Sequence, residues 1–199
     1  MIDRLGTGAY NWPTRLPHSF APLVCRCLHV PVSVKNSEVL FAALKSAGIT
    51  LLSALPETWL VHVMQMAEDD PDMTLIRLNK EEEGVGISTG AHLAGRKSAM
   101  LMQNHGLLTS VNGIVSVAQL YRIPLLMVIS YRGEMGERDP WQTEGGRITE
   151  PLLQSLGIIY RKLSDPATVA YQVRQAQTLA DSSLRPVALL LTRELMWEE

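Results

Sequence analysis

The sequence predicts an α/β protein of three layers, in which helices cover both faces of a central, mainly parallel sheet of about six strands. Two observations lead to this fold class. From residue 36 onward, stretches with apolar residues at helical spacing alternate with short apolar runs. Those runs are continuously apolar, which is typical of strands buried on both faces of a parallel sheet. The chain has 199 residues, which suits one such domain better than two small ones.

The first half of this regular region predicts two strands and the helices around them. In the first helix the apolar residues fall on one face, Ser37 can cap the start, and Gly48 can cap the end. Pro56 closes the first strand. The expected elements in chain order are a helix over 37–48, a strand over 49–55, a helix over 58–68, a strand over 74–78 and a helix over 80–95.

The second half predicts four more strands and one long loop. Residues 131–147 follow a strongly apolar strand and are mostly polar, so we expect a loop there. The last long helix opens on Asp165 and Pro166, a pair that suits a first helical turn. The expected elements are strands over 98–103, 123–130, 158–163 and 185–192, and helices over 110–122, 149–157 and 165–183.

The N-terminal segment differs from the rest of the chain. It shows no clean periodicity and carries four prolines, Pro13, Pro17, Pro22 and Pro31. We expect residues 1–35 to form an arm that packs on another surface or stays mobile. The folded domain is then predicted to comprise residues 36–199.

Composition excludes several classes of partner. The net charge is −2, so no basic surface indicates nucleic acid. No apolar run is long enough to cross a bilayer, and the start of the chain lacks the pattern of a signal peptide, so we expect a cytoplasmic protein without membrane contact. Cys25 and Cys27 are too few for a zinc site, and we expect two unrelated thiols and no metal ligands in this chain.

The stretch 80–95, "KEEEGVGISTGAHLAG", has glycine spacing close to that of a dinucleotide-binding turn. Glu81, Glu82 and Glu83 stand at the helix start, where they favour the helix but repel a phosphate. The acid expected about 20 residues later to hold a ribose is also missing. Two explanations remain open. The small residues let the helix pack closely on a neighbour, or a buried carboxylate lies there with a ligand against it.

Ligands of open parallel sheets bind beyond the carboxyl ends of the strands. In this chain those positions fall in four segments, 56–58, 79–84, 103–110 and 130–147. We therefore expect the functional residues in these segments.

Five motifs in order carry a resemblance to a known family. They are "LPETWL", "NKEEEGVGISTGAHLAG", "LMQNHGLLTSVNGI", "YRIPLLMVISYRGE" and "EGGRIT". Over residues 36–192 the chain resembles the pyrimidine-binding domain of thiamine-diphosphate enzymes. More narrowly, it is similar to the α subunit of sulfopyruvate decarboxylase and to the matching half of phosphonopyruvate decarboxylase.

The resemblance implies a role for one acid of the glycine-rich stretch. In such enzymes a glutamate at the start of this helix hydrogen-bonds the aminopyrimidine ring of the cofactor and shares a proton with it. Counting back nine residues from Gly90, as the family spacing implies, gives Glu81. Glu82 and Glu83 are then solvated or interface acids, unless the alignment is displaced by one residue. Pro56 and Asn104 are the other residues implied to contact the cofactor.

The resemblance also implies a missing half. In the family a second domain, marked by G-D-G, holds the cofactor diphosphate through Mg²⁺, and this chain contains no G-D-G. A separate β subunit is expected to supply that domain, with the cofactor across the interface. The assembly would be α2β2 or higher.

Further site residues follow from the same motifs. His105 is either a surface or packed histidine or a proton donor and acceptor near the reacting carbon. Arg132 and Arg147 form structural salt bridges or bind an anionic tail. Thr58 takes the place of a serine in the Pro-x-Ser turn of the family and is implied to bind the substrate carboxylate. Gln142 is a weaker candidate for substrate binding, and Asn104 either orients the substrate or caps the next helix.

The implied activity is decarboxylation of a 2-oxo acid with a small anionic tail, such as a sulfonate or phosphonate. The close relatives usually show "QNSGLGN" where this chain has His105, Leu108 and Thr109, so the substrate stays open. Carboligation, as in acyloin or acetolactate synthesis, is a second enzymatic possibility. A non-catalytic subunit that only completes or regulates an assembly is a third.

Overall fold

The structure, a computed structural model, describes residues 31–198 and contains one six-stranded sheet. Every pair of neighbouring strands is parallel, and the order across the sheet is β2-β1-β3-β4-β6-β5. The strands are β1 (Leu51–Ala54), β2 (Thr74–Arg77), β3 (Ser98–Gln103), β4 (Leu125–Ser130), β5 (Ile159–Leu163) and β6 (Pro186–Leu191). All six predicted strands are confirmed.

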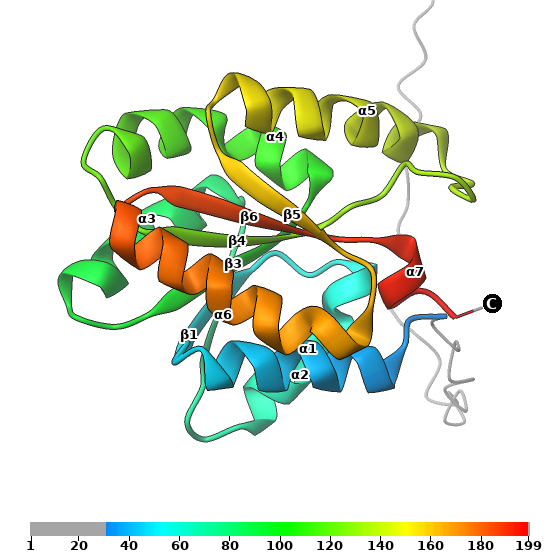
Figure 1. The fold of residues 1–199 in the computed structure, drawn as a ribbon, viewed down its shortest axis with the longest axis horizontal. Coiled ribbons are helices and arrows are strands. Elements are labelled where there is room, and N and C mark those ends of the chain that lie inside the picture. Colours follow the sequence, from blue (N-terminus) through cyan, green and yellow to red (C-terminus); the bar gives the residue numbers. More distant parts are fainter. Residues whose placement is uncertain (1–30, 199) are drawn as a thin grey trace, which may run out of the picture. The chain divides into compact units, whose positions relative to one another are not determined.

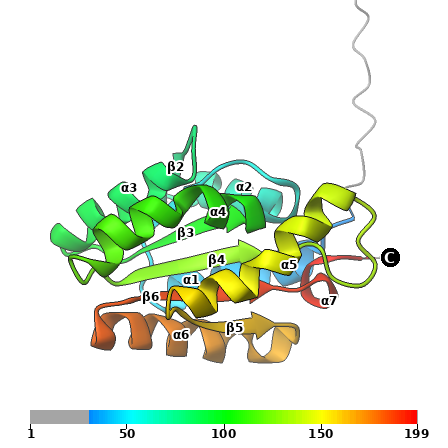
Figure 2. The ribbon, with the colours of Figure 1, turned by 90° about the horizontal axis from the view of Figure 1, so that it is seen from above.

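Helices cover both faces of the sheet, so the predicted three-layer α/β fold is also confirmed. One face carries α3, α4 and α5, and the other carries α1, α2 and α6 (Figures 1 and 2). Their bounds are α1 (Val34–Ser46), α2 (Val61–Asp69), α3 (Glu82–Leu93), α4 (Asn104–Gly113), α5 (Pro140–Ser155), α6 (Pro166–Ser183) and α7 (Arg193–Met196). A 3-10 turn, η1 (Thr58–Leu60), precedes α2, and a π-helical segment, η2 (Ile114–Gln119), continues α4. No helix within the described range is long and apolar enough to cross a membrane.

The hydrophobic core lies along the central strands. β1, β4 and β6 are buried at every position, and β3 is buried except at Gln103. The two edge strands, β2 and β5, are more exposed. This difference explains the sequence pattern, because a strand covered on both faces and flanked on both sides needs apolar side chains throughout.

Three turns at the amino ends of the strands contain a glycine with a positive φ angle. Gly48, Gly95 and Gly157 have φ angles of +85°, +73° and +64°, and they end α1, α3 and α5 just before β1, β3 and β5. A residue in the left-handed conformation after a helix redirects the chain, and glycine adopts this conformation without steric cost. The predicted role of Gly48 at the end of the first helix is thus confirmed.

The predicted cap of the first helix is wrong. Ser33, not Ser37, is the N-cap, and its hydroxyl accepts the Asn36 N–H at 3.2 Å. Ser37 is buried within α1 and donates to the Ser33 carbonyl at 2.8 Å. Val32 pairs with Trp197 in an isolated antiparallel bridge. The folded unit therefore starts at Pro31 and includes residues 31–35, and the predicted arm otherwise lies outside the described residues, as do Cys25 and Cys27.

Two helices begin earlier than predicted. α4 starts at Asn104, directly after β3, whereas the predicted helix starts only at residue 110. α5 starts at Pro140, so the loop after β4 ends at Asp139 and not at residue 147. Asp139 and Pro140 form the same helix-opening pair that correctly predicts α6, but Gly145, Gly146 and Pro151 obscure the helical pattern behind it.

Candidate active site

The candidate site lies at the carboxyl edge of the sheet, around the ends of β1 and β3. The chain leaves β1 toward α2 on one face and leaves β3 toward α4 on the opposite face. Such a switch in direction opens a crevice between neighbouring strands, and ligands of open α/β sheets bind there. The turns that follow β1, β2, β3 and β4 all meet at this edge, because the strands are parallel.

Glu81 immediately precedes α3, and its side chain is turned into the protein. It is only 6% exposed and makes no capping bond to its own helix. Its Oε2 accepts a hydrogen bond from the Thr109 hydroxyl of α4 at 3.3 Å. Its Oε1 accepts no hydrogen bond from any residue between 31 and 198. This oxygen is not one of the enclosed side-chain atoms that lack a partner, so it keeps some accessible surface and can accept a hydrogen bond from a ligand.

Gly106 makes room for this carboxyl group. A Cβ atom at Gly106 would lie 2.7 Å from Glu81 Cγ and 2.9 Å from its Oε1. Both distances are shorter than any van der Waals contact allows, so only glycine fits at this position without displacing Glu81. The sequence does not indicate this role, because Gly106 precedes the region predicted as helix.

The structure bears on both explanations of the glycine-rich stretch, close packing at one residue and a buried acid at another. Gly84 packs closely on the sheet, since a Cβ there would lie 3.0 Å from Ser53 Oγ and 3.1 Å from the Met100 side chain. Gly86 and Gly90 face open space. Glu81 is the buried carboxylate. Glu82 and Glu83 lie nearer the surface, where Glu82 pairs with Lys80 at 2.7 Å.

Glu57 is a second inward-facing acid, and sequence reasoning missed it. Its Oε2 accepts the Trp59 N–H at 3.0 Å and so caps η1. Its Oε1 accepts from the hydroxyl of Ser130, the last residue of β4, at 2.5 Å. Burial raises the pKa of Glu57, although both of these bonds and the charge of Arg132 oppose the shift. An acid directly after a proline at a strand end is the signal that could have drawn attention to it.

Asn104 and Gln142 bring unpaired amide oxygens to the end of β3. Asn104 is fully buried, and its Nδ2 donates to the Arg132 carbonyl at 2.6 Å. Because a carbonyl only accepts, this bond fixes the amide orientation and leaves Oδ1 without a partner. Gln142 donates to Gln103 Oε1 at 3.2 Å, and its own Oε1 is also unpaired.

His105 lies in the first turn of α4 and is half-buried against α5. A Cβ atom at Gly145 would lie 2.8 Å from His105 Cε1, so the ring packs directly on the α5 backbone. The motif "EGGRIT" thus has a packing reason, since Gly146 likewise lies against the Arg132 carbonyl. The two glycines therefore allow α5 to pack closely on His105, which follows β3, and on Arg132, which follows β4.

Arg132 is engaged in an ion-pair network. Its guanidinium donates to both carboxyl oxygens of Glu137 at 2.6 and 2.7 Å and to Asp139 at 3.1 Å. It also lies 5.4 Å from the centre of the Trp59 ring. Burial opposes ionisation of Glu137, but Arg132 and nearby backbone amides outweigh it and lower the pKa of Glu137 to about 2. Of the two roles considered for Arg132, the salt bridge is the one present in the structure.

The remaining predicted residues are exposed. Pro56 and Thr58 are exposed in the turn between β1 and η1. Arg147 lies on α5 with its side chain 73% exposed and pairs weakly with Glu144 at 3.4 Å. These three residues are accessible to a ligand or to another chain.

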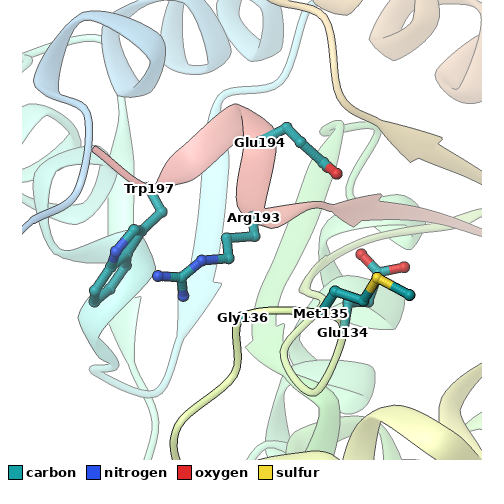
Figure 3. A pocket seen from close by; sticks show the side chains of 6 residues that line it. All are labelled: Glu134, Met135, Gly136, Arg193, Glu194 and Trp197. Atoms are coloured by element: carbon teal, nitrogen blue, oxygen red, sulfur yellow. The ribbon is translucent and has the colours of Figure 1, made fainter. Parts of the chain in front are cut away.

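A separate cavity of about 730 Å³ lies where the chain leaves β4 and β6. Figure 3 shows Arg193 of α7 pointing toward Trp197, with Glu134 and Met135 on the opposite wall. The Arg193 guanidinium carbon lies 4.6 Å from the centre of the Trp197 ring. None of the residues that surround Glu81 lines this cavity, so the cavity is distinct from the Glu81 site.

No cluster of three or more His, Cys, Asp or Glu side chains within residues 31–198 is placed to hold a metal ion. The residues present do fit one part of an organic cofactor. The unpaired Oε1 of Glu81 suits a ring nitrogen that carries or shares a proton.

Comparison with known proteins agrees with this arrangement. Residues 34–145, more than half of the chain, match the family described as thiamine pyrophosphate enzyme, N-terminal TPP binding domain. The chain is 38% identical over 162 residues to the sulfopyruvate decarboxylase subunit alpha of Methanococcus maripaludis, covering 81% of this chain and 96% of that protein. It is 37% identical over 160 residues to the subunit of the same name from Methanothermobacter thermautotrophicus, covering 80% and 97%.

A solved structure supports the fold. A putative thiamin diphosphate-dependent enzyme from Mycobacterium smegmatis aligns with a TM-score of 0.65 at 17% identity. The alignment covers 82% of this chain but only 31% of that one, so the shared fold accounts for about a third of the larger enzyme. The motif order, the parallel sheet and the family match agree, and the chain belongs to the thiamine pyrophosphate enzymes as a counterpart of their N-terminal TPP-binding domain.

Proposed function

We propose that this chain is the α subunit of a two-chain thiamine-diphosphate enzyme that decarboxylates a 2-oxo acid with a small anionic tail. The observation that carries the proposal is the buried carboxyl group of Glu81, with one oxygen bound to Thr109 and the other unpaired. The similarity to sulfopyruvate decarboxylase alpha subunits over most of both chains supports the reaction class.

Glu81 is proposed to hydrogen-bond the aminopyrimidine ring of the cofactor through its free oxygen. When bound, thiamine diphosphate supplies the carbon nucleophile and accepts the electrons that carbon dioxide leaves behind. The task of Glu81 is to hold a proton at the ring nitrogen. Thr109 and Gly106 fix the direction of the carboxyl group, and Pro56 and Asn104 would contact the same ring.

A partner chain completes the proposed site. This chain lacks G-D-G and, within the described residues, a cluster suited to a metal ion. A β subunit with a G-D-G domain would hold the diphosphate through Mg²⁺ and cover the Glu81 crevice. The word "subunit" in the names of the relatives supports a multichain enzyme. The proposed assembly is α2β2 or higher, if the homologous chains pair as they do in the family.

The substrate would lie at the mouth of the crevice. Thr58 is exposed there and can donate to the substrate carboxylate. Asn104 and Gln142 are proposed to add amide groups, although their unpaired oxygens are enclosed in the chain by itself. Arg147 is the more available partner for an anionic tail, because Arg132 would first have to leave Glu137. His105 is proposed as the group that moves a proton near the reacting carbon.

The experiment is to purify the chain with a G-D-G-bearing partner and measure carbon dioxide release. The panel should contain thiamine diphosphate, Mg²⁺ and 2-oxo acids with sulfonate, phosphonate, carboxylate or neutral tails. Glu81→Gln should lower kcat at least about 100-fold, since general acid–base groups contribute that much or more. Glu83→Gln, a change of the same size at an exposed acid, should leave kcat within about threefold.

The same experiment addresses the other possible functions. If Glu81→Gln leaves turnover unchanged, the chain is a non-catalytic subunit and the proposal is wrong. Carboligation is the second candidate. The segment with His105, Leu108 and Thr109 includes the hydroxyl that binds Glu81, and the resemblance implies a different sequence there in the related decarboxylases. Product analysis separates the two reactions: an aldehyde indicates decarboxylation, and an acyloin or acetolactate-like product indicates carboligation.

A further inference from the structure

Glu57 joins two strands that are not neighbours. Its carboxyl group binds Ser130 at the end of β4, although β3 lies between β1 and β4 in the sheet. Neighbouring strands are about 4.8 Å apart, so this connection spans roughly 10 Å across the end of β3. It therefore lies at the crevice where the chain switches direction.

The second oxygen of Glu57 fixes the turn that carries Thr58. By accepting the Trp59 N–H at 3.0 Å, it caps η1, whose first residue is Thr58. Trp59 itself is 1% exposed and anchors the turn in the core. The exposed Thr58 side chain thus lies between a buried indole and a half-buried carboxyl group.

We propose that Glu57 is a positioning residue that ties the Thr58 turn to the end of β4 and so sets where Thr58 meets the substrate. The proposal rests on the proposed function, because it uses Thr58 as a substrate-binding residue. Glu57 itself does not touch the substrate: both of its oxygens are used within the chain.

The surroundings of Glu57 suit a carboxylic acid as well as a carboxylate. One oxygen faces an amide N–H, which only donates, and the other faces a hydroxyl, which both donates and accepts. Arg132 is the nearby cation, but Glu137 and Asp139 already neutralise it. Glutamine can reproduce both bonds, with its carbonyl toward Trp59 and its NH₂ toward Ser130, whereas alanine reproduces neither.

The test compares Glu57→Gln, Glu57→Ala and Ser130→Ala in the complex with the partner chain. Thr58 would contribute to substrate binding in the ground state and the transition state alike, so Glu57→Ala should raise KM about tenfold and change kcat by less than about threefold. Glu57→Gln should keep both constants within about threefold of the unmodified chain. Glu38→Ala, at an exposed acid of α1, is the control and should change neither constant.

Ser130→Ala covers the case in which Glu57→Ala does not fold. It removes the connection to β4 but keeps the cap on Trp59, so KM should rise in the same direction by a smaller factor. The double variant, Glu57→Ala with Ser130→Ala, should have the same KM as Glu57→Ala alone, because both substitutions remove the same hydrogen bond between Glu57 and Ser130. An unchanged KM in both Glu57→Ala and Ser130→Ala would overturn the proposal, as would a loss in Glu57→Gln equal to that in Glu57→Ala.

A second measurement does not depend on enzyme activity. Hydrogen exchange of the Trp59 amide should be at least about tenfold faster in Glu57→Ala and unchanged in Glu57→Gln, since only alanine removes the acceptor. If the unmodified complex has no thiamine-dependent activity, the proposed function fails, and this exchange still decides whether Glu57 holds the turn. If the complex is active but Trp59 exchanges equally in all variants, only the role of Glu57 is wrong.

Discussion

Glu81 owes its position to the absence of a side chain on the neighbouring helix. Gly106 lies in the first turn of α4, where a Cβ atom would collide with Glu81. Thr109, one turn further along, supplies the hydroxyl that binds Oε2. The two residues together fix the carboxyl group from the side of α4.

Gly106→Ala should therefore disturb the site more than the helix. The added methyl group must push Glu81 or Met102 aside, which typically costs about 1–3 kcal/mol and moves the acid away from its ligand. We expect a loss of kcat of at least about tenfold in the complex with the partner chain. Thermal unfolding and steady-state kinetics measure the two effects.

Gly86→Ala provides the matched control for Gly106→Ala. A Cβ atom there meets nothing within 4 Å, and alanine is favoured over glycine inside a helix by about 1 kcal/mol. The control should be as stable as the unmodified chain or more so, with unchanged kcat. Equal kinetics for the two variants would show that Gly106 does not position Glu81.

Gly145 supports His105 in a similar way. Gly145→Ala should displace the imidazole, because the added carbon would lie 2.8 Å from His105 Cε1. If His105 moves a proton in the reaction, kcat should fall about tenfold or more. His105→Gln should cause a comparable loss, and the double variant should add little to either single change. If the losses of kcat in the two single variants add fully in the double variant, Gly145 does not act through His105.

At the scale of elements, the strands could be predicted, and the starts of α4 and α5 could not. The strands are short and apolar because both of their faces are covered, and that pattern is visible in the sequence. The beginnings of α4 and α5 contain Gly106, Gly145 and Gly146, which weaken the helical signal. Those glycines are explained only by the side chains and backbone packed against them, which are distant in sequence.

The residues of the candidate site could likewise be predicted only in part. Glu81 was found through the family spacing, and its burial fits the role implied for it. Glu57 was not found, because its partner Ser130 lies 73 residues away and on a strand that is not adjacent. Whether Arg132 pairs within the chain or with a ligand could not be decided either, because Glu137 and Asp139 belong to a loop without regular spacing.

The loop after β4 should show its ion pair in the pH dependence of stability. The pKa of Glu137 is lowered from 4.5 to about 2, so its contribution is present above about pH 4.5 and is lost as the pH falls toward 2. Glu137→Gln should cost about 2 kcal/mol at pH 7, because the side chains of both partners are shielded from solvent. The difference from the unmodified chain should shrink between pH 4.5 and 2.

Denaturant unfolding at several pH values measures this difference. Glu144→Gln is the control, since Glu144 is 73% exposed and only weakly paired with Arg147. A stability difference for Glu137→Gln that stays constant down to pH 2 would mean that the ion pair with Arg132 does not stabilise the loop.

At the scale of the whole molecule, the crevice is proposed to be one half of an active site. The Glu81 side offers an acid for the pyrimidine ring but, among the described residues, no cluster for a metal ion. The isolated chain should therefore bind thiamine diphosphate weakly and not turn over, and addition of the partner chain should restore both. Isothermal titration calorimetry with and without the partner measures the difference. Tight binding or decarboxylation by the isolated chain would contradict the two-chain proposal.

The uniform strand direction also has a practical consequence. The glycine-closed turns at Gly48, Gly95 and Gly157 sit at the rim opposite Glu57 and Glu81. Affinity tags, fluorophores or short insertions placed in those turns would be remote from catalysis, and randomised libraries in the turns at the other rim would leave the hydrophobic centre intact. Because the two sets of turns lie at opposite ends of the strands, residues at one end can be varied to change the substrate range without altering the hydrophobic core.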